Sequence, residues 1–134
     1  MSSKGEQKVE KILKQNHFTF QKEVKFEKLN GFKQPLRFDF AVFKNGQFLF
    51  LLEVDGKQHF EFIPYFHKSQ AGFRKEILMD EKKNSFCLLN GIPLIRIPYW
   101  ALDDLTLKDI LMNSNFRVKS KHHYNYFNRN GGVR

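Results

Sequence analysis

The sequence predicts an α/β (α+β) fold in which a mixed central sheet is flanked by helices, in the order α-β-β-β-α-β-α. Apolar residues recur at helical spacing in some segments and alternate, or run together, in others. The chain has 134 residues, the size of one domain. Its 16 phenylalanines can fill a hydrophobic core without a disulfide or a structural metal.

The predicted elements are separated by clear breaks. Val9 and Leu13 share one face of the first helix. The run FLFLLEV is almost wholly apolar, which is typical of a central strand covered on both faces. A hairpin turn is expected at residues 44–46, and Asp103 or Asp104 is the expected N-cap of the last helix. The helices are predicted at residues 6–15, 73–89 and 104–112, and the strands at residues 18–26, 36–43, 48–54 and 94–99.

Residues 1–115 are expected to form the domain, and residues 116–134 a separate C-terminal tail. The tail, FRVKSKHHYNYFNRNGGVR, contains five Lys and Arg, several aromatic residues and no acid. It is either a disordered terminus or a basic arm whose aromatic rings stack on a nucleic acid. Composition alone does not separate these two interpretations.

The composition favours a nucleic-acid partner inside a cell. The formal net charge is +9, with 23 Lys and Arg against 14 Asp and Glu, and an excess of this size indicates a polyanionic partner. Cys87 is the only cysteine, which excludes an internal disulfide and suits a reducing compartment. No apolar run reaches the ~18 residues of a membrane span, and the N-terminus has no secretory core. We therefore expect a cytoplasmic protein without a membrane partner.

Two acids lie on helix faces that should be apolar. Asp80 is in the middle of a stripe formed by Phe73, Ile77 and Cys87 on the long helix, and Glu6 repeats this pattern on the first helix. A charge that faces a core is unfavourable unless it is paired or bound to a metal. Each acid is therefore either functional, part of a buried salt bridge, or at the exposed edge of its stripe.

Two further acids occur on adjacent predicted strands. Asp39 lies inside LRFDFAVF and Glu53 ends FLFLLEV, so together they offer a hard divalent cation its preferred oxygen ligands. Asp55 points to the same face as Glu53. In the loop that follows, His59 could accept a proton from an attacking water and Lys57 could hold a phosphate. An ordinary loop histidine and a solvated lysine are the alternatives.

The turn between these strands decides whether the acids meet. A two-residue turn at Asn45-Gly46 with no irregularity would direct Asp39 and Glu53 to opposite faces. A three-residue loop with Gly46 at positive φ, or a bulge with the same effect, would let them converge. The functional interpretation requires one of these two, and we predict the three-residue loop.

The stretches LRFDFAVF, LLEVDGKQHF, MDEKKNSFC and IPLIRIPYW resemble those of the PD-(D/E)XK nuclease superfamily. More narrowly, the chain resembles its very-short-patch-repair-endonuclease-like (EDxHD) branch, which includes small phage and bacterial endonucleases. The resemblance covers roughly residues 3–100, and its best motif is EVDGKQH at residues 53–59. It implies a restriction-endonuclease-like core and hydrolysis of DNA phosphodiester bonds with Mg²⁺, for which Mn²⁺ is the expected substitute.

The resemblance also implies a set of site residues. Matched by position, the catalytic residues are Glu6, Asp39, Glu53, His59 and Asp80, with Asp39 and Glu53 as the metal ligands. One position departs from the broader superfamily, because Asp55 stands where a lysine two residues after the strand acid is usual. The general base is therefore left open between His59 and Lys57.

The remaining expectations concern substrates and partners. A nicking, homing-type or structure-specific enzyme is compatible with the resemblance, as are a homodimer and a phage-encoded protein acting in a bacterial host. The alternative is a catalytically inactive nuclease-fold module that only binds nucleic acid. A zinc site using His67, His122 or His123 is disfavoured, because the spacing does not suit it. The expected DNA contacts are Lys57, Lys83, Arg117, Lys119 and Lys121.

Overall fold

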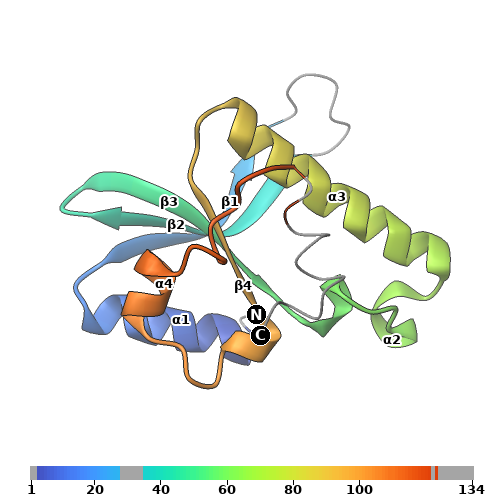
Figure 1. Cartoon of the computed structure of the whole chain (residues 1–134), viewed down its shortest axis with the longest axis horizontal. Coiled ribbons are helices and arrows are strands. Elements are labelled where there is room, and N and C mark those ends of the chain that lie inside the picture. The colour runs from blue at the N-terminus through green and yellow to red at the C-terminus, as the bar shows by residue number, and fades with distance from the viewer. Residues whose placement is uncertain (1–2, 28–34, 122, 124–134) are drawn as a thin grey trace.

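A four-stranded mixed sheet forms the centre of the protein (Figure 1), as the sequence predicted. The computed structural model describes residues 3–27, 35–121 and 123. The strands lie in the order β1-β2-β3-β4; β1, β2 and β3 pair antiparallel, and β4 pairs parallel with β3. Their bounds are β1 (Thr19–Phe26), β2 (Leu36–Lys44), β3 (Gln47–Asp55) and β4 (Leu94–Pro98).

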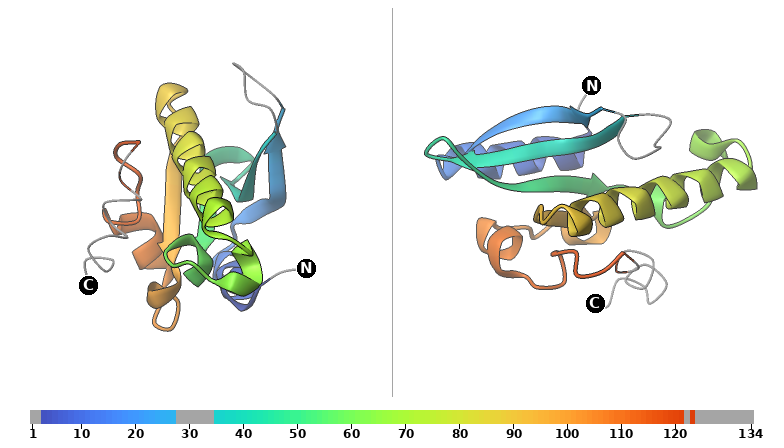
Figure 2. Two further views of the ribbon diagram at one scale, coloured as in Figure 1. Left: turned by 90° about the vertical axis from the view of Figure 1, so that its right-hand side faces the viewer. Right: turned by 90° about the horizontal axis from the view of Figure 1, so that it is seen from above.

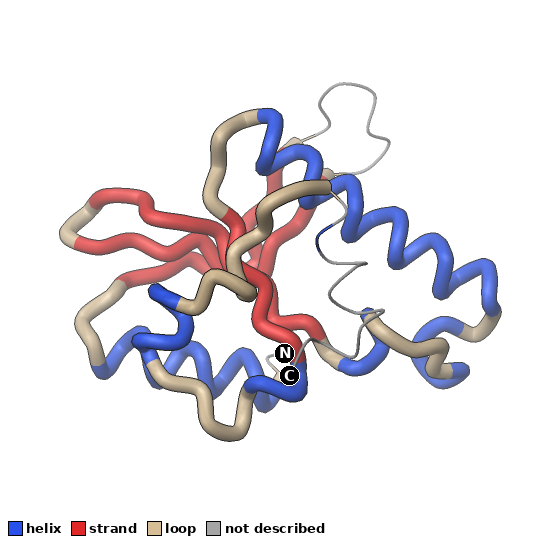
Figure 3. The backbone as a smooth tube through the Cα atoms, in the orientation of Figure 1, coloured by secondary structure: helices blue, strands red, loops and turns tan. Residues whose placement is uncertain are grey.

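Helices cover both faces of this sheet (Figure 2), and the described residues form a hydrophobic core on each face. Val9, Leu13 and Ile110, from the first and last helices, pack on one face, whereas Phe86 and Cys87 of the long helix pack on the other. The tube in Figure 3 shows the long helix running away from the sheet at its N-terminal end. The helical elements are α1 (Lys4–Gln15), η1 (Lys57–His59), α2 (Pro64–His67), α3 (Gln70–Leu89), η2 (Tyr99–Ala101) and α4 (Leu107–Met112).

Local sequence explains where the helices begin. The Ser3 hydroxyl accepts a hydrogen bond from the Glu6 N–H, and the Ser69 hydroxyl accepts one from the Gly72 N–H, so each serine satisfies a free donor of the first turn. The cap at Ser69 starts α3 earlier than the apolar pattern indicated. The predicted N-cap of α4 is wrong, because Thr106 and Asp109 form a capping box that satisfies two donors reciprocally.

The turn between β2 and β3 differs from the sequence prediction. Lys44 pairs with Gln47, so the turn has two residues, and the predicted three-residue loop is wrong. Asn45 (φ 52°) and Gly46 (φ 78°) are both left-handed. An Asn-Gly pair tolerates positive φ at both positions, which suits the twist of the flanking strands. The positive φ predicted for Gly46 is confirmed.

A β-bulge compensates for the shorter turn. Adjacent residues of β2 pair with Phe48 and Phe50, so Leu49 is the additional residue on β3. Beyond the bulge the ladder continues as far as Phe40 with Leu52. The next step along both strands brings Asp39 opposite Glu53, so the bulge lets the two acids converge, as the functional interpretation required.

The chain after α4 returns to the sheet before it leaves the described part. Arg117 forms an antiparallel bridge with Ile95 of β4, and its neighbours Phe116 and Val118 are buried in the two cores. Of the tail expected at residues 116–134, the structure describes residues 116–121 and 123, and the prediction for residues 122 and 124–134 lies outside the described residues. In the part of the chain that is described, no helix is long and apolar enough to cross a membrane.

Candidate active site

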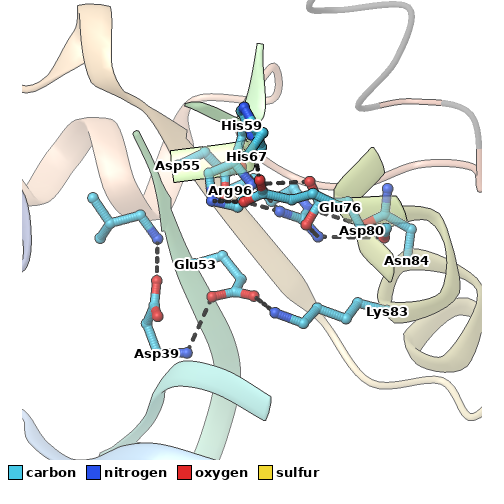
Figure 4. Close-up of polar contacts among 11 residues, drawn as sticks. Asp39, Glu53, Asp55, His59, His67, Glu76, Asp80, Lys83, Asn84 and Arg96 are labelled. Carbon is cyan, nitrogen blue, oxygen red and sulfur yellow. Dashed lines mark hydrogen bonds and ion pairs between the residues drawn. The ribbon is translucent and has the colours of Figure 1, made fainter. Parts of the chain in front are cut away.

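Asp39 and Glu53, called the acid pair below, meet where β2 and β3 diverge (Figure 4). The Asp39 N–H donates to Glu53 Oε2 at 3.1 Å, and the Val54 N–H donates to Asp39 Oδ2 at 2.8 Å. Side-chain oxygens therefore take the hydrogen bonds that neighbouring backbone carbonyls would accept in a continuous ladder. Both carboxyl groups are held in place by backbone donors.

The two carboxyl groups differ in charge. Burial, the neighbouring charge of Glu53 and a hydrogen bond with Glu53 raise the pKa of Asp39 to about 9. Burial would also raise the pKa of Glu53, but the positive charges of Lys83 and Arg96 lower it to about 2. At neutral pH and without a bound metal ion, the acid pair therefore holds one proton, on Asp39, and one negative charge, on Glu53.

Lys83 of α3 completes this centre. Its Nζ forms an ion pair with Glu53 Oε1, and only 15% of its side chain is exposed. The sequence predicted Lys83 only as a DNA contact. Its role beside Glu53 could not be deduced from spacing, because the two residues are 30 positions apart and meet only when α3 packs on the sheet.

A second cluster lies farther along the same face of β3 and consists of Asp55, His59, Asp80 and Arg96, called the His59 cluster below. Arg96 Nη1 binds both oxygens of Asp55, at 2.9 and 3.0 Å, and Arg96 Nη2 lies 3.6 Å from Asp80 Oδ1. His59 Nδ1 lies 2.9 Å from Asp80 Oδ2. Two buried carboxylates thus face two cations. The buried position of Asp80 is confirmed, whereas Arg96 was missed because it lies within an apolar strand.

The charge state of His59 differs from the expectation. Burial alone would lower its pKa, but the negative charges of Asp55, Asp80 and Glu76 raise it to about 9. The imidazole is therefore protonated at neutral pH. The neutral imidazole that a general base requires is disfavoured at this pH, because three carboxylates surround the ring.

Glu76 connects His59 to a second histidine. His67 Nδ1 accepts a hydrogen bond from the Ile63 N–H at 2.9 Å, so the proton of a neutral His67 is on Nε2, which donates to Glu76 Oε2 at 2.6 Å. Glu76 Oε1 lies 3.6 Å from His59 Nε2. His67 thus fixes the loop between β3 and α3. Its aromatic surroundings, Phe62 and Phe73, gave no sign of this role in the sequence.

The other predicted residues lie nearer the surface. Glu6 is half-buried on α1, and burial is the largest cause of its raised pKa. Lys22 and Ser3 oppose this rise, whereas the charges of Glu23 and Glu53 add to it, so Glu6 lies within electrostatic range of the acid pair. Lys57 is exposed and lies 3.9 Å from Glu61, which does not identify it as a base. Among the described residues after α4, three cations are exposed: Arg117, Lys119 and Lys121.

The donor set suits a hard cation with few protein ligands. Within the described residues there is no group of three or more His, Cys, Asp or Glu side chains that could hold a metal ion. The acid pair supplies two carboxylates. Mg²⁺ is commonly bound through one or two carboxylates, with water and substrate phosphate completing its shell. The acid pair therefore fits Mg²⁺, whereas a structural zinc site would need more ligands.

Taken together, the fold and the site define a mixed α+β protein with a buried acid pair and an adjoining His59 cluster. Three viral proteins are similar to part of the chain. The chain is 42% identical over 59 residues to Uncharacterized protein 307L of Invertebrate iridescent virus 6, covering 44% of this chain and 27% of that protein. It is 38% identical over 60 residues to Uncharacterized protein 094L of Frog virus 3 (isolate Goorha), covering 44% of this chain and 35% of that protein.

A third relative, Uncharacterized protein 033L of Invertebrate iridescent virus 3, is 38% identical over 48 residues, covering 36% of this chain and 25% of that protein. The alignments thus span between a quarter and about a third of these relatives' length. No protein-family model matches the chain, and no solved structure matches it.

Proposed function

We propose that this protein is a Mg²⁺-dependent DNA endonuclease with a restriction-endonuclease-like core. The observation that carries the proposal is the acid pair, where Asp39 and Glu53 converge with the Lys83 ammonium bound to Glu53. The two carboxylates on β2 and β3 can hold a metal ion that assists phosphodiester hydrolysis, and the Lys83 ammonium on α3 adds a positive charge beside them. The net charge of +9 supports a polyanionic substrate.

The acid pair would hold the cation, and Lys83 would act as a cation beside it. A bound Mg²⁺ would polarise the scissile phosphate and stabilise the charge that develops on it. Asp39 must lose its proton for this, so metal binding and proton release are coupled. Lys83 keeps Glu53 ionised and places a positive charge where a phosphate oxygen can approach.

His59 has the charge of a proton donor. Because its pKa is raised to about 9, it is an imidazolium at neutral pH, and the 2.9 Å contact with Asp80 fixes the orientation of its ring. Asp55 lies two residues beyond Glu53 on the same face of β3, about 7 Å along the strand. This geometry favours His59 as the general acid that protonates the leaving oxygen, with Asp80 and Glu76 as its positioning residues.

One observation favours a second candidate, a nuclease-fold module that only binds nucleic acid. The ammonium of Lys83 neutralises Glu53, and Asp39 carries a proton. The acid pair therefore does not repel a phosphate even when no metal ion is bound. Incubation of linear, nicked, mismatched and four-way DNA with Mg²⁺ or with EDTA separates the candidates. Cleavage that requires Mg²⁺ supports the nuclease, whereas binding without cleavage of any substrate supports the binding module.

A further inference from the structure

A basic cavity of about 460 Å³ lies next to the acid pair on the side of the sheet covered by α3. Its three cations come from β1, β2 and α3, and the described residues that line it include no acid. Like charges repel one another, so packing elsewhere in the fold must hold these three elements together. The lining residues are Lys25, Pro35, Arg37, Met79 and Lys83.

Lys83 belongs to both the cavity and the candidate active site. Its ammonium is bound to Glu53 and lies 5.5 Å from the centre of the Phe38 ring, and its side chain is largely buried. A ligand in the cavity therefore lies one side chain away from the acid pair. An anion there would compete with Glu53 for the Lys83 ammonium.

Arg37 is available to a ligand at little cost. Arg37 Nη1 lies 3.8 Å from Glu23 Oε1, and both side chains are more than half exposed. A surface pair of this kind contributes little to stability, because solvent screens it. The guanidinium can therefore turn towards an anion, and its planar donors suit phosphate oxygens.

The shape and the walls of the cavity restrict the chemistry of the ligand. Cations exclude a metal ion, and Met79 and Pro35 add an apolar wall that a bare anion would not use. A volume of about 460 Å³ is far larger than one phosphate and lies within the range of sites for small organic ligands. A phosphodiester together with its sugar and base satisfies the cations, the apolar wall and the size.

We propose that the basic cavity binds a backbone phosphate of the nucleic acid next to the phosphate that is cut, with Lys25 and Arg37 as its principal contacts. This inference rests on the proposed function, because it places the same substrate in a defined path beside the acid pair. Lys83 then lies between the phosphate bound in the cavity and the phosphate that is cut at the acid pair. Occupation of the cavity draws the ammonium away from Glu53 and leaves that carboxylate more exposed to the cation.

The test compares two double variants of the full chain that each remove two positive charges. Lys25→Gln with Arg37→Gln alters the cavity, and Lys11→Gln with Lys108→Gln alters exposed positions on α1 and α4, across the sheet. Binding of fluorescent single-stranded and duplex DNA is measured by anisotropy over a salt series in EDTA. Thermal unfolding of each variant reports whether it folds. Binding of a free 5′-deoxynucleoside monophosphate is compared with binding of the oligonucleotides.

We expect the cavity variant to bind DNA roughly tenfold or more weakly than the control variant, with the salt slope for duplex DNA reduced by about 0.9 for each phosphate that the variant no longer neutralises. An equal loss of affinity in both variants overturns the inference, since net charge alone would then explain binding. Equal affinity for the free nucleotide and the oligonucleotide would reassign the cavity to a nucleotide and also overturns it. EDTA removes metal ions, so this assay reports binding independently of cleavage. A protein that binds DNA through the cavity but never cuts it would therefore refute the nuclease function and leave the cavity proposal intact.

Discussion

Replacing Asp39 with asparagine should stabilise the metal-free protein while abolishing cleavage. The asparagine amide oxygen can still accept from the Val54 N–H, and its NH₂ group can replace the side-chain hydrogen bond to Glu53. The backbone N–H of residue 39 still donates to Glu53 Oε2, so the native hydrogen bonds survive. What disappears is the requirement to keep a carboxyl group protonated in the folded state. The folded pKa of Asp39 is about 9, whereas its unfolded value is 3.8.

The sign and the size of the change in stability with pH follow from this pKa shift. A raised carboxyl pKa means that the folded state holds a proton the unfolded state releases, so stability falls as pH rises from 3.8 towards 9. At pH 7 the loss amounts to about 4 kcal/mol, from 1.36 kcal/mol for each pH unit above 3.8. This is an upper limit, because water reaching a partly exposed carboxyl group screens its surroundings. The asparagine variant has no such loss.

Urea denaturation of both proteins in EDTA at several pH values measures this difference. We expect similar free energies of unfolding near pH 4 and an advantage of about 2–4 kcal/mol for the variant near pH 7. Added Mg²⁺ should raise the melting temperature of the wild type and leave that of the variant unchanged. A difference that does not change with pH, or a variant less stable at pH 7, would refute the assigned proton and with it the coupling between metal binding and proton release.

Three further predictions follow from the same charges. The His59→Ala variant should lose about 10²–10⁴-fold in cleavage rate, and the wild-type rate should fall as pH rises through about 9, a step that the variant lacks in its pH–rate profile; a rate that instead rises there would make His59 a base. The Arg96→Met variant should lose roughly 3–5 kcal/mol of unfolding free energy in urea, because two buried carboxylates lose their partner; a near-neutral change would show that the His59 cluster adds no stability. Glutamine at Arg117, Lys119 and Lys121 together should flatten the salt dependence of duplex binding by up to about 0.9 for each of the three cations, and an unchanged slope would remove these residues from the interface.

The sequence was sufficient for the elements that depend on local pattern. The run FLFLLEV indicated a central strand, and β3 has Phe50, Leu51 and Leu52 buried, because helices cover both faces. Asp80 stood out because it interrupts an apolar stripe. These signals lie within one element, so periodicity alone reveals them.

The parts that were missed depend on how elements meet. The bulge at Leu49 corrects the register of the acids, but an Asn-Gly turn and a longer loop are both compatible with the same residues. Lys83 and Arg96 look like a surface lysine and an unexpected strand residue until α3 packs on β3 and β4. The charge of His59 could not be predicted either, because it results from carboxylates on separate segments of the chain.

The most direct test of the account is cleavage by the wild type and by two variants that each remove one carboxylate. Asp39→Asn removes one ligand of the acid pair, and Asp104→Asn removes an exposed acid as the matched control. Linear, nicked, mismatched and four-way DNA are each incubated with Mg²⁺, Mn²⁺ or EDTA, and binding is measured in parallel. We expect the wild type and the control to cleave DNA only with a metal ion, and Asp39→Asn to cleave none while binding DNA at least as tightly. Cleavage by Asp39→Asn at the wild-type rate, or no cleavage of any substrate by the wild type, would contradict the proposed role of the acid pair.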